Sequence, residues 1–269
     1  MAPPALFVTP VTPVAPVALP RRSSHAARNR SVRRPPPTCT ADDLFSRLSH
    51  VNPNLRKKAS YQLSERATPQ IITRLISELS VEDVAHRRAA VQALSMTGLP
   101  ALQPVLHQLD TTDNVTVRAS CAKVLSGIAL YFPDARQTFP QAAFNSLQTA
   151  LQHGDPVTKL ATIGCLATMG SDFKEGGQVT ANGNASAVQI LFSLCTASSD
   201  MVVAATAAGA LAQIAQNGTP ETKQHVIDHF QSLTASPEAD DEPGFNYVRE
   251  MVSSHLEQLK SKSVVSDRE

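Results

Sequence analysis

The sequence predicts an all-α fold, a right-handed α-solenoid of about six stacked helix pairs. The main observation is a phrase in which a basic residue is followed by a small residue three positions later and a leucine seven positions later. It occurs three times at intervals of 31 residues: Arg56, Ala59 and Leu63; Arg87, Ala90 and Leu94; Arg118, Cys121 and Leu125. A helical phrase repeated at this period is typical of stacked helix pairs. The chain also lacks Trp and has only 4% aromatic residues, so thin side chains would let its helices pack closely.

Residues 1–40 have the composition of an organelle-targeting segment. They hold six arginines, no acidic residue and nine of the chain's 19 prolines. An acid-free, arginine-bearing start is typical of transit peptides. The prolines prevent the amphipathic helix that mitochondrial import favours. We therefore expect a disordered chloroplast transit peptide and a protein of the plastid stroma; the alternative is a disordered tail that the mature protein keeps.

Residues 41–260 are predicted to form the solenoid, and 261–269 a flexible tail. We name the first helix of each pair A and the second B, and expect the A helices on the convex side and the B helices on the concave side. The predicted pairs are 41–50 with 55–66, 69–79 with 81–98, 99–109 with 114–132, 141–152 with 156–170, 185–196 with a helix through Ala204 and Leu211, and 219–233 with 245–259. Asp83 and Asp113 precede their B helices, where a carboxylate can cap the free first-turn amides.

After the third pair the interval lengthens. Lys159, Ala204 and Arg249 fill the position of the repeated arginine, at steps of 41, 45 and 45 residues. Insertions rich in Gly, Pro, Asn, Ser or acidic residues account for this, and they predict loops near 131–140, 170–184 and 234–244. Because such insertions fall between helices, we expect them to be mobile.

Charge, hydropathy and cysteine spacing exclude several classes of protein. Beyond residue 40 the chain has 18 basic and 23 acidic residues, a net charge of −5, whereas a nucleic-acid binder needs a concentrated basic face. No run of 18 apolar residues occurs, so we expect no membrane span. The four cysteines are far apart, which is typical of buried thiols in a reducing compartment.

The basic residues of the repeated phrase are the candidate binding residues. Stacking of the pairs would place them in a row that could bind carboxylates of a protein partner or ligand. The alternative is structural, because the same side chains could bond acids or carbonyls of the neighbouring repeat, such as the carboxylates of Asp83 and Asp113. The candidate partner-binding residues are Arg56, Arg87, Arg88, Arg118 and Lys159.

No catalytic or metal-binding set is evident. His225 and His229 are four residues apart on one predicted helix, but no third ligand accompanies them. The chain has no GxSxG motif and no glycine-rich loop between a strand and a helix. We therefore predict no catalytic residues and no metal site.

Three stretches carry a resemblance to a known family. Residues 81–98 (VEDVAHRRAAVQALSMTG), 112–125 (TDNVTVRASCAKVL) and 154–170 (GDPVTKLATIGCLATMG) resemble the HEAT-like repeats of the phycobilin lyase family. That family includes the E/F-type lyase subunits and phycobilisome-maintenance proteins. The resemblance covers residues 44 to about 215.

The resemblance implies a function that the spacing alone does not. It implies binding of a phycobiliprotein subunit on the concave face, transient contact with a linear tetrapyrrole (phycobilin), and a second HEAT-repeat lyase subunit as a possible partner. The protein would attach, isomerise or detach the chromophore, or support phycobilisome assembly or turnover without catalysis. The alternative is a non-catalytic adaptor for another plastid assembly machine, such as an iron–sulfur carrier.

Overall fold

The computed structural model describes residues 39–171, 183–198, 200–235 and 243–266. These residues form twelve α-helices and two short 3-10 helices, and none of them lies in a β-strand. The α-helices are α1 (Ala41–Arg47), α2 (Pro53–Glu65), α3 (Pro69–Ser77), α4 (Val84–Thr97), α5 (Leu99–Thr111), α6 (Val115–Tyr131), α7 (Gln141–His153), α8 (Pro156–Gly170), α9 (Gly183–Ala197), α10 (Met201–Asn217), α11 (Pro220–Ala235) and α12 (Pro243–Ser266). Most of the predicted targeting segment (1–38) and the central parts of two predicted loops (172–182 and 236–242) lie outside the described residues.

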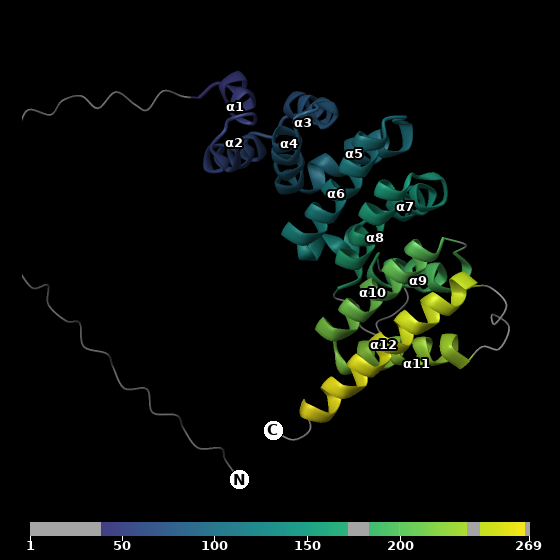
Figure 1. The fold of residues 1–269 in the computed structure, drawn as a ribbon. Helices are drawn as coiled ribbons and strands as arrows, with labels where there is room; N and C mark the ends of the chain where they lie inside the picture. The colour runs from purple at the N-terminus through teal and green to yellow at the C-terminus, as the bar shows by residue number, and fades with distance from the viewer. Residues whose placement is uncertain (1–38, 172–182, 199, 236–242, 267–269) are drawn as a thin grey trace, which may run out of the picture. The chain divides into compact units, whose positions relative to one another are not determined.

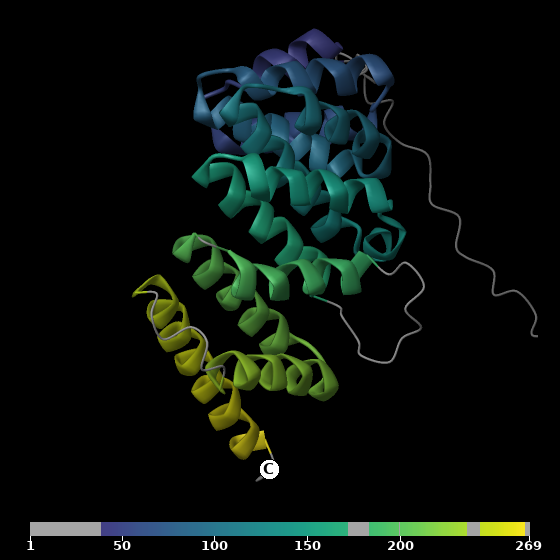
Figure 2. The same ribbon diagram turned by 90° about the vertical axis from the view of Figure 1, so that its right-hand side faces the viewer.

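The helices stack as pairs in chain order (Figures 1 and 2). Odd-numbered helices are the A helices and even-numbered helices are the B helices. Each B helix packs against the B helix before it and the one after it, from α2 through to α12. The A helices α3, α5, α7 and α9 pack in succession as a second layer. The prediction of an all-α solenoid is therefore confirmed.

A capping side chain fixes the start of five successive B helices. In each case its oxygen accepts a hydrogen bond from the backbone amide two residues later. The capping residues are Asn52, Asp83, Asn114, Asp155 and Asp200. The predicted cap at Asp83 is confirmed, whereas the prediction for Asp113 was wrong by one residue. Asn114 caps two amides of α6 at once, so the carboxylate of Asp113 is not needed there.

The repeated phrase marks the buried face of each B helix. The small residue lies seven positions after the cap and the leucine eleven, so both point towards the A layer. Ala59, Ala90, Cys121, Thr162 and Ala207 fill the first position and Leu63, Leu94, Leu125, Leu166 and Leu211 the second; all ten are buried. Each buried leucine stabilises the fold by about 1.5–3 kcal/mol.

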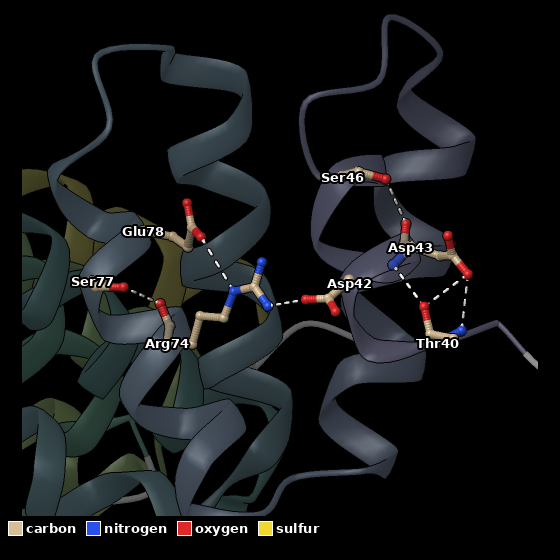
Figure 3. Close-up of polar contacts among 7 residues, drawn as sticks. All are labelled: Thr40, Asp42, Asp43, Ser46, Arg74, Ser77 and Glu78. Carbon is tan, nitrogen blue, oxygen red and sulfur yellow. Dashed lines mark hydrogen bonds and ion pairs between the residues drawn. The ribbon is translucent and has the colours of Figure 1, made fainter.

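The first A helix is joined to the second by Arg74 (Figure 3). The Arg74 guanidinium forms an ion pair with Asp42 of α1, and its Nε lies 3.9 Å from Glu78. The guanidinium carbon also lies 4.0 Å from the centre of the Phe45 ring, a cation–π contact. A capping box between Thr40 and Asp43 begins α1, so the first repeat has a defined start.

Two predicted non-helical segments are ordered in the structure. Pro133–Thr138, within the predicted loop at 131–140, forms a 3-10 helix. Its Arg136 is buried and donates to the carbonyl of Ala129 at 2.7 Å and to the hydroxyl of Ser171 at 2.7 Å. The predicted tail is also partly helical, because α12 continues to Ser266. Buried side chains order the first segment, and continuation of a long packed helix orders the second.

No helix among the described residues combines the length and the apolar character that a membrane crossing requires.

Two glycines in neighbouring B helices provide a matched test of the packing. A methyl group at Gly127 of α6 would lie 2.1 Å from Oγ of Ser95 on α4, whereas one at Gly164 of α8 would meet nothing within 4 Å. We expect Gly127→Ala to lower the free energy of unfolding by about 1–3 kcal/mol through overpacking. Gly164→Ala should raise it by up to about 1 kcal/mol, since alanine is the better helix former. Urea unfolding followed by circular dichroism measures both; equal effects would contradict the close packing of α4 and α6.

Candidate functional site

The three repeated arginines bond within their own helix pairs. In each, a guanidinium nitrogen donates to the carbonyl oxygen six residues earlier, in the turn between the A and B helices. The donor–acceptor distances are 2.7 Å from Arg56 to His50, 2.6 Å from Arg87 to Val81, and 2.6 Å from Arg118 to Thr112. Each acceptor lies two residues before the cap of its B helix, so the three bonds are the same bond repeated.

These bonds support the structural alternative for the arginines. Carbonyls near a helix end lack partners in the helix, and a charged donor satisfies them strongly. The acceptors are turn carbonyls of the same pair, however, and the prediction that named the carboxylates of Asp83 and Asp113 is corrected on this point. Partner binding by these arginines stays a prediction.

Lys159 fills the same position in the fourth pair but reaches the next pair instead. Its Nζ lies 3.7 Å from Oδ2 of Asp200, the residue that caps α10. Both side chains line a pocket of about 420 Å³ together with Gln148, Gln152 and Ser193. Because both charges are partly exposed, this ion pair adds at most about 1 kcal/mol to stability.

Arg88 differs from its neighbour Arg87. The Arg88 side chain is exposed, whereas Arg87 is partly buried and donates to Val81. Arg88 lies at the fifth position after the cap of α4, and exposed residues at the second, fifth and ninth positions lie on one side of each B helix. We call the exposed residues at these three positions in α2, α4, α6, α8 and α10 the B face.

The B face carries three exposed cations. Lys57 of α2 and Arg88 of α4 fill the fifth position, Lys123 of α6 fills the ninth, and all three are exposed. The helices α4, α6, α8 and α10 contain no Asp or Glu at all. Sequence reasoning from the repeated phrase missed Lys123, although counting from the cap of each helix would have placed it on this face.

The histidine pair packs against an aromatic ring. The ring of His229 lies 4.0 Å from that of Phe192 on α9, and the ring of His225 lies 5.2 Å from it. Within the described ranges, no three His, Cys, Asp or Glu side chains come together as a metal site would require. This pair therefore joins α11 to α9.

Three of the four thiols are buried in the core. Burial raises the pKa of Cys121 to about 12 and that of Cys195 to about 12, and it raises the pKa of Cys165 further. Since the thiolate is the nucleophile, these three side chains are unreactive at neutral pH in the folded protein.

The adjacent arginines of α4 give a direct test of the turn bond. We expect Arg87→Ala to lower the free energy of unfolding by about 1–3 kcal/mol, because the carbonyl of Val81 loses a charged donor. Arg88→Ala should change it by less than about 0.5 kcal/mol, since that side chain is exposed. Chemical denaturation of both variants measures the difference, and equal losses would contradict the structural role of Arg87.

The pair at α9 and α11 predicts a pH dependence. Burial lowers the pKa of His229, the nearby His225 lowers it further, and a backbone hydrogen bond with Phe192 opposes them. Near its ordinary pKa of about 6.5, His229 is therefore protonated more in the unfolded chain than in the folded one. Stability should fall as the pH drops through this value, and His229→Gln should reduce that fall.

Hydrogen exchange of α11 at pH 7.5 and 5.5 measures this effect. The exposed His107 offers a control, because His107→Gln should leave the pH dependence unchanged. An acid-induced increase in exchange that is the same in both variants would show that His229 is not its source.

Comparison with known proteins assigns the repeats. Residues 41–126 match the family model of HEAT repeats. The crystal structure of Kap121p has a similar fold, with a TM-score of 0.51 and 16% identity over 80% of this chain and 25% of that one.

Two relatives are similar to this chain over most of their own length. The uncharacterized phycocyanin operon protein Z of Pseudanabaena tenuis is 26% identical over 219 residues, 81% of this chain and 95% of that protein. The bilin biosynthesis protein CpeZ of Synechococcus sp. is 29% identical over 171 residues, 64% of this chain and 86% of that protein. The predicted resemblance is thus confirmed as a similarity: residues 41–126 match HEAT repeats, and the chain is similar to proteins named for a phycocyanin operon and for bilin biosynthesis.

Proposed function

We propose that this protein binds a phycobiliprotein subunit on its B face, in the plastid stroma, and supports chromophore attachment or phycobilisome assembly and turnover. The observation that carries the proposal is the exposed cationic B face of a chain whose relatives are named for a phycocyanin operon and for bilin biosynthesis. Repeat solenoids use such extended faces to bind other proteins. The arginine-rich, acid-free segment 1–40 supports the plastid location.

The buried thiols support a role in handling a client. Attachment of a bilin needs a reactive thiol as acceptor, and Cys121, Cys165 and Cys195 are enclosed and protonated. The fourth cysteine, Cys39, is only partly buried. The proposal places the acceptor cysteine on the client, and any contact of this protein with a linear tetrapyrrole would be transient. A second HEAT-repeat lyase subunit could supply further residues to the same reaction.

Among the five candidate residues we assign client contact first to Arg88. Its side chain is exposed on the B face. The guanidinium groups of Arg56, Arg87 and Arg118 bond the turn carbonyls before their helices. We therefore assign them the structural role of fixing where the B helices begin. Lys159 is partly exposed, lies beside Asp200, and lines the pocket of about 420 Å³ described above.

A non-catalytic adaptor for another plastid assembly machine, such as an iron–sulfur carrier, is the second candidate. The observation that favours it is the use of the repeated arginines inside the fold, where their bonds to turn carbonyls serve architecture. The two candidates differ in the client and in covalent chemistry, and one experiment separates them.

Binding and chromophore attachment should be measured with the same proteins. The full chain is mixed with apo-phycobiliprotein α and β subunits, and complexes are detected by size-exclusion chromatography and calorimetry. We expect a stable complex with a subunit and, after addition of a phycobilin, more covalent chromophore absorbance in acidic urea than without the protein. Binding without added attachment would assign an assembly role, and binding of neither subunit would reject the proposal in favour of the second candidate.

The matched variants are Arg88→Glu and Lys223→Glu, which change the charge equally on α4 and on the A helix α11. Arg88→Glu should weaken binding by about tenfold, because it places an acid among the exposed cations of the B face. Lys223→Glu should bind like the natural chain. Equal affinities of both variants and the natural chain would remove Arg88 from the interface.

A further inference from the structure

The B face changes its chemistry along the row of helices. At the end formed by α2, α4 and α6 its exposed residues include Lys57, Arg88 and Lys123. At the end formed by α8 and α10 the corresponding positions hold Val157 and Leu160, which are 56% and 41% exposed, and Val202, which is 57% exposed. The face is therefore cationic in one half and apolar in the other.

A glycine stands at the ninth position of both helices in the apolar half; the one in α8 is exposed, whereas a Cβ at Gly209 of α10 would lie 3.8 Å from Nε2 of His255 on α12. Gly164 of α8 and Gly209 of α10 fill the ninth position after their caps, where α2 has Tyr61 and α6 has Lys123. A methyl group at Gly164 would touch nothing within 4 Å, so that position is open to an incoming side chain. α10 has no charged residue over its whole length.

Both halves lack their complement within the face. The B helices α4, α6, α8 and α10 contain no acid to pair with Arg88 and Lys123, whereas α2 has the exposed Glu65 near its end. The exposed Val157, Leu160 and Val202 lie on two adjacent helices, and neighbouring exposed apolar residues mark interaction sites on soluble proteins. A partner that complements both halves would carry acidic side chains where it meets the exposed cations. It would carry apolar side chains where it meets Val157, Leu160 and Val202.

We propose that the B face docks, in one fixed direction, a protein segment whose acidic end lies over α2 to α6 and whose apolar end lies over α8 and α10. Neighbouring packed helices lie about 8–10 Å apart, so the two steps from α4 to α8 span about 16–20 Å. A client helix rises about 1.5 Å per residue, so its acidic and apolar residues should be about 11–13 positions apart. The opposite direction would place acidic side chains on the apolar half and desolvate them.

This chemistry favours a protein over a nucleic acid. A phosphate backbone needs cations along its whole path. The charge-free α10 offers none. The inference rests on the proposed function only in taking a protein as the occupant, and it adds the charge, the order and the spacing of the segment that is recognised.

Labelled helical peptides test the surface independently of any phycobiliprotein. One peptide of about 25 residues carries glutamates at one end and leucines about 11–13 positions away. A second replaces the glutamates with lysines, and a third keeps the glutamates but replaces the leucines with serines. Fluorescence anisotropy with the full chain should show the first binding at least about tenfold more tightly than either other peptide, and more weakly as salt rises.

Variants of the chain locate the two halves. Lys123→Glu should weaken the acidic–apolar peptide about tenfold, whereas Lys223→Glu on α11 should not. Leu160→Ser should lower its affinity to that of the serine peptide, whereas Leu99→Ser, on the A helix α5 and similarly exposed at 50%, should leave it unchanged. Equal binding of the glutamate and lysine peptides, or equal effects of the face and control variants, would overturn the proposal, as would tighter binding of a single-stranded oligonucleotide.

The two proposals fail in different ways. Binding of the acidic–apolar peptide without binding of any phycobiliprotein subunit would reject the proposed client and keep the surface. If a subunit binds and neither Lys123→Glu nor Leu160→Ser changes its affinity, the proposed docking surface is rejected and the proposed client is kept.

Discussion

The hydrogen bonds at the start of each B helix set the register on which the rest of the molecule depends. A capping oxygen fixes the first turn, and in three repeats an arginine four residues later bonds the carbonyl two residues before the cap. The chain is thereby held on both sides of the turn. Once the start is fixed, the helical period decides which positions enter the core and which form the B face.

This dependence explains which parts of the fold could be predicted from the sequence. The interval between repeats and the buried leucines follow from periodicity, so the helix pairs could be assigned. Asp113 and Asn114 are both capping residues by type, and only the backbone geometry selects Asn114. The order of Pro133–Thr138 depends on burial of Arg136 against Ala129 and Ser171, and Ser171 lies 35 residues away along the chain, beyond the reach of a local pattern.

The candidate site was harder to predict than the fold, because identical residue types serve opposite purposes. Arg87 and Arg88 are neighbours in the chain, yet a rotation of about 100° along the helix turns one to the turn carbonyl and the other to solvent. The basic residue that recurs at a fixed interval serves a structural purpose common to the repeats: it bonds a carbonyl of the turn between the A and B helices. Binding residues differ between repeats, since each repeat meets a different part of a partner, and repetition therefore conceals them.

The absence of acids from the B helices α4, α6, α8 and α10 has a physical cost that architecture does not require. Beyond residue 40 the chain is acidic in total. Among the B helices, however, α4, α6, α8 and α10 contain no Asp or Glu, so their exposed lysine and arginine side chains have no acid in their own helices to pair with. Acids placed four residues from those cations would add about 0.2–0.5 kcal/mol each to helix stability. The proposed partner would supply the missing acids to these cations and would cover the apolar side chains beside them.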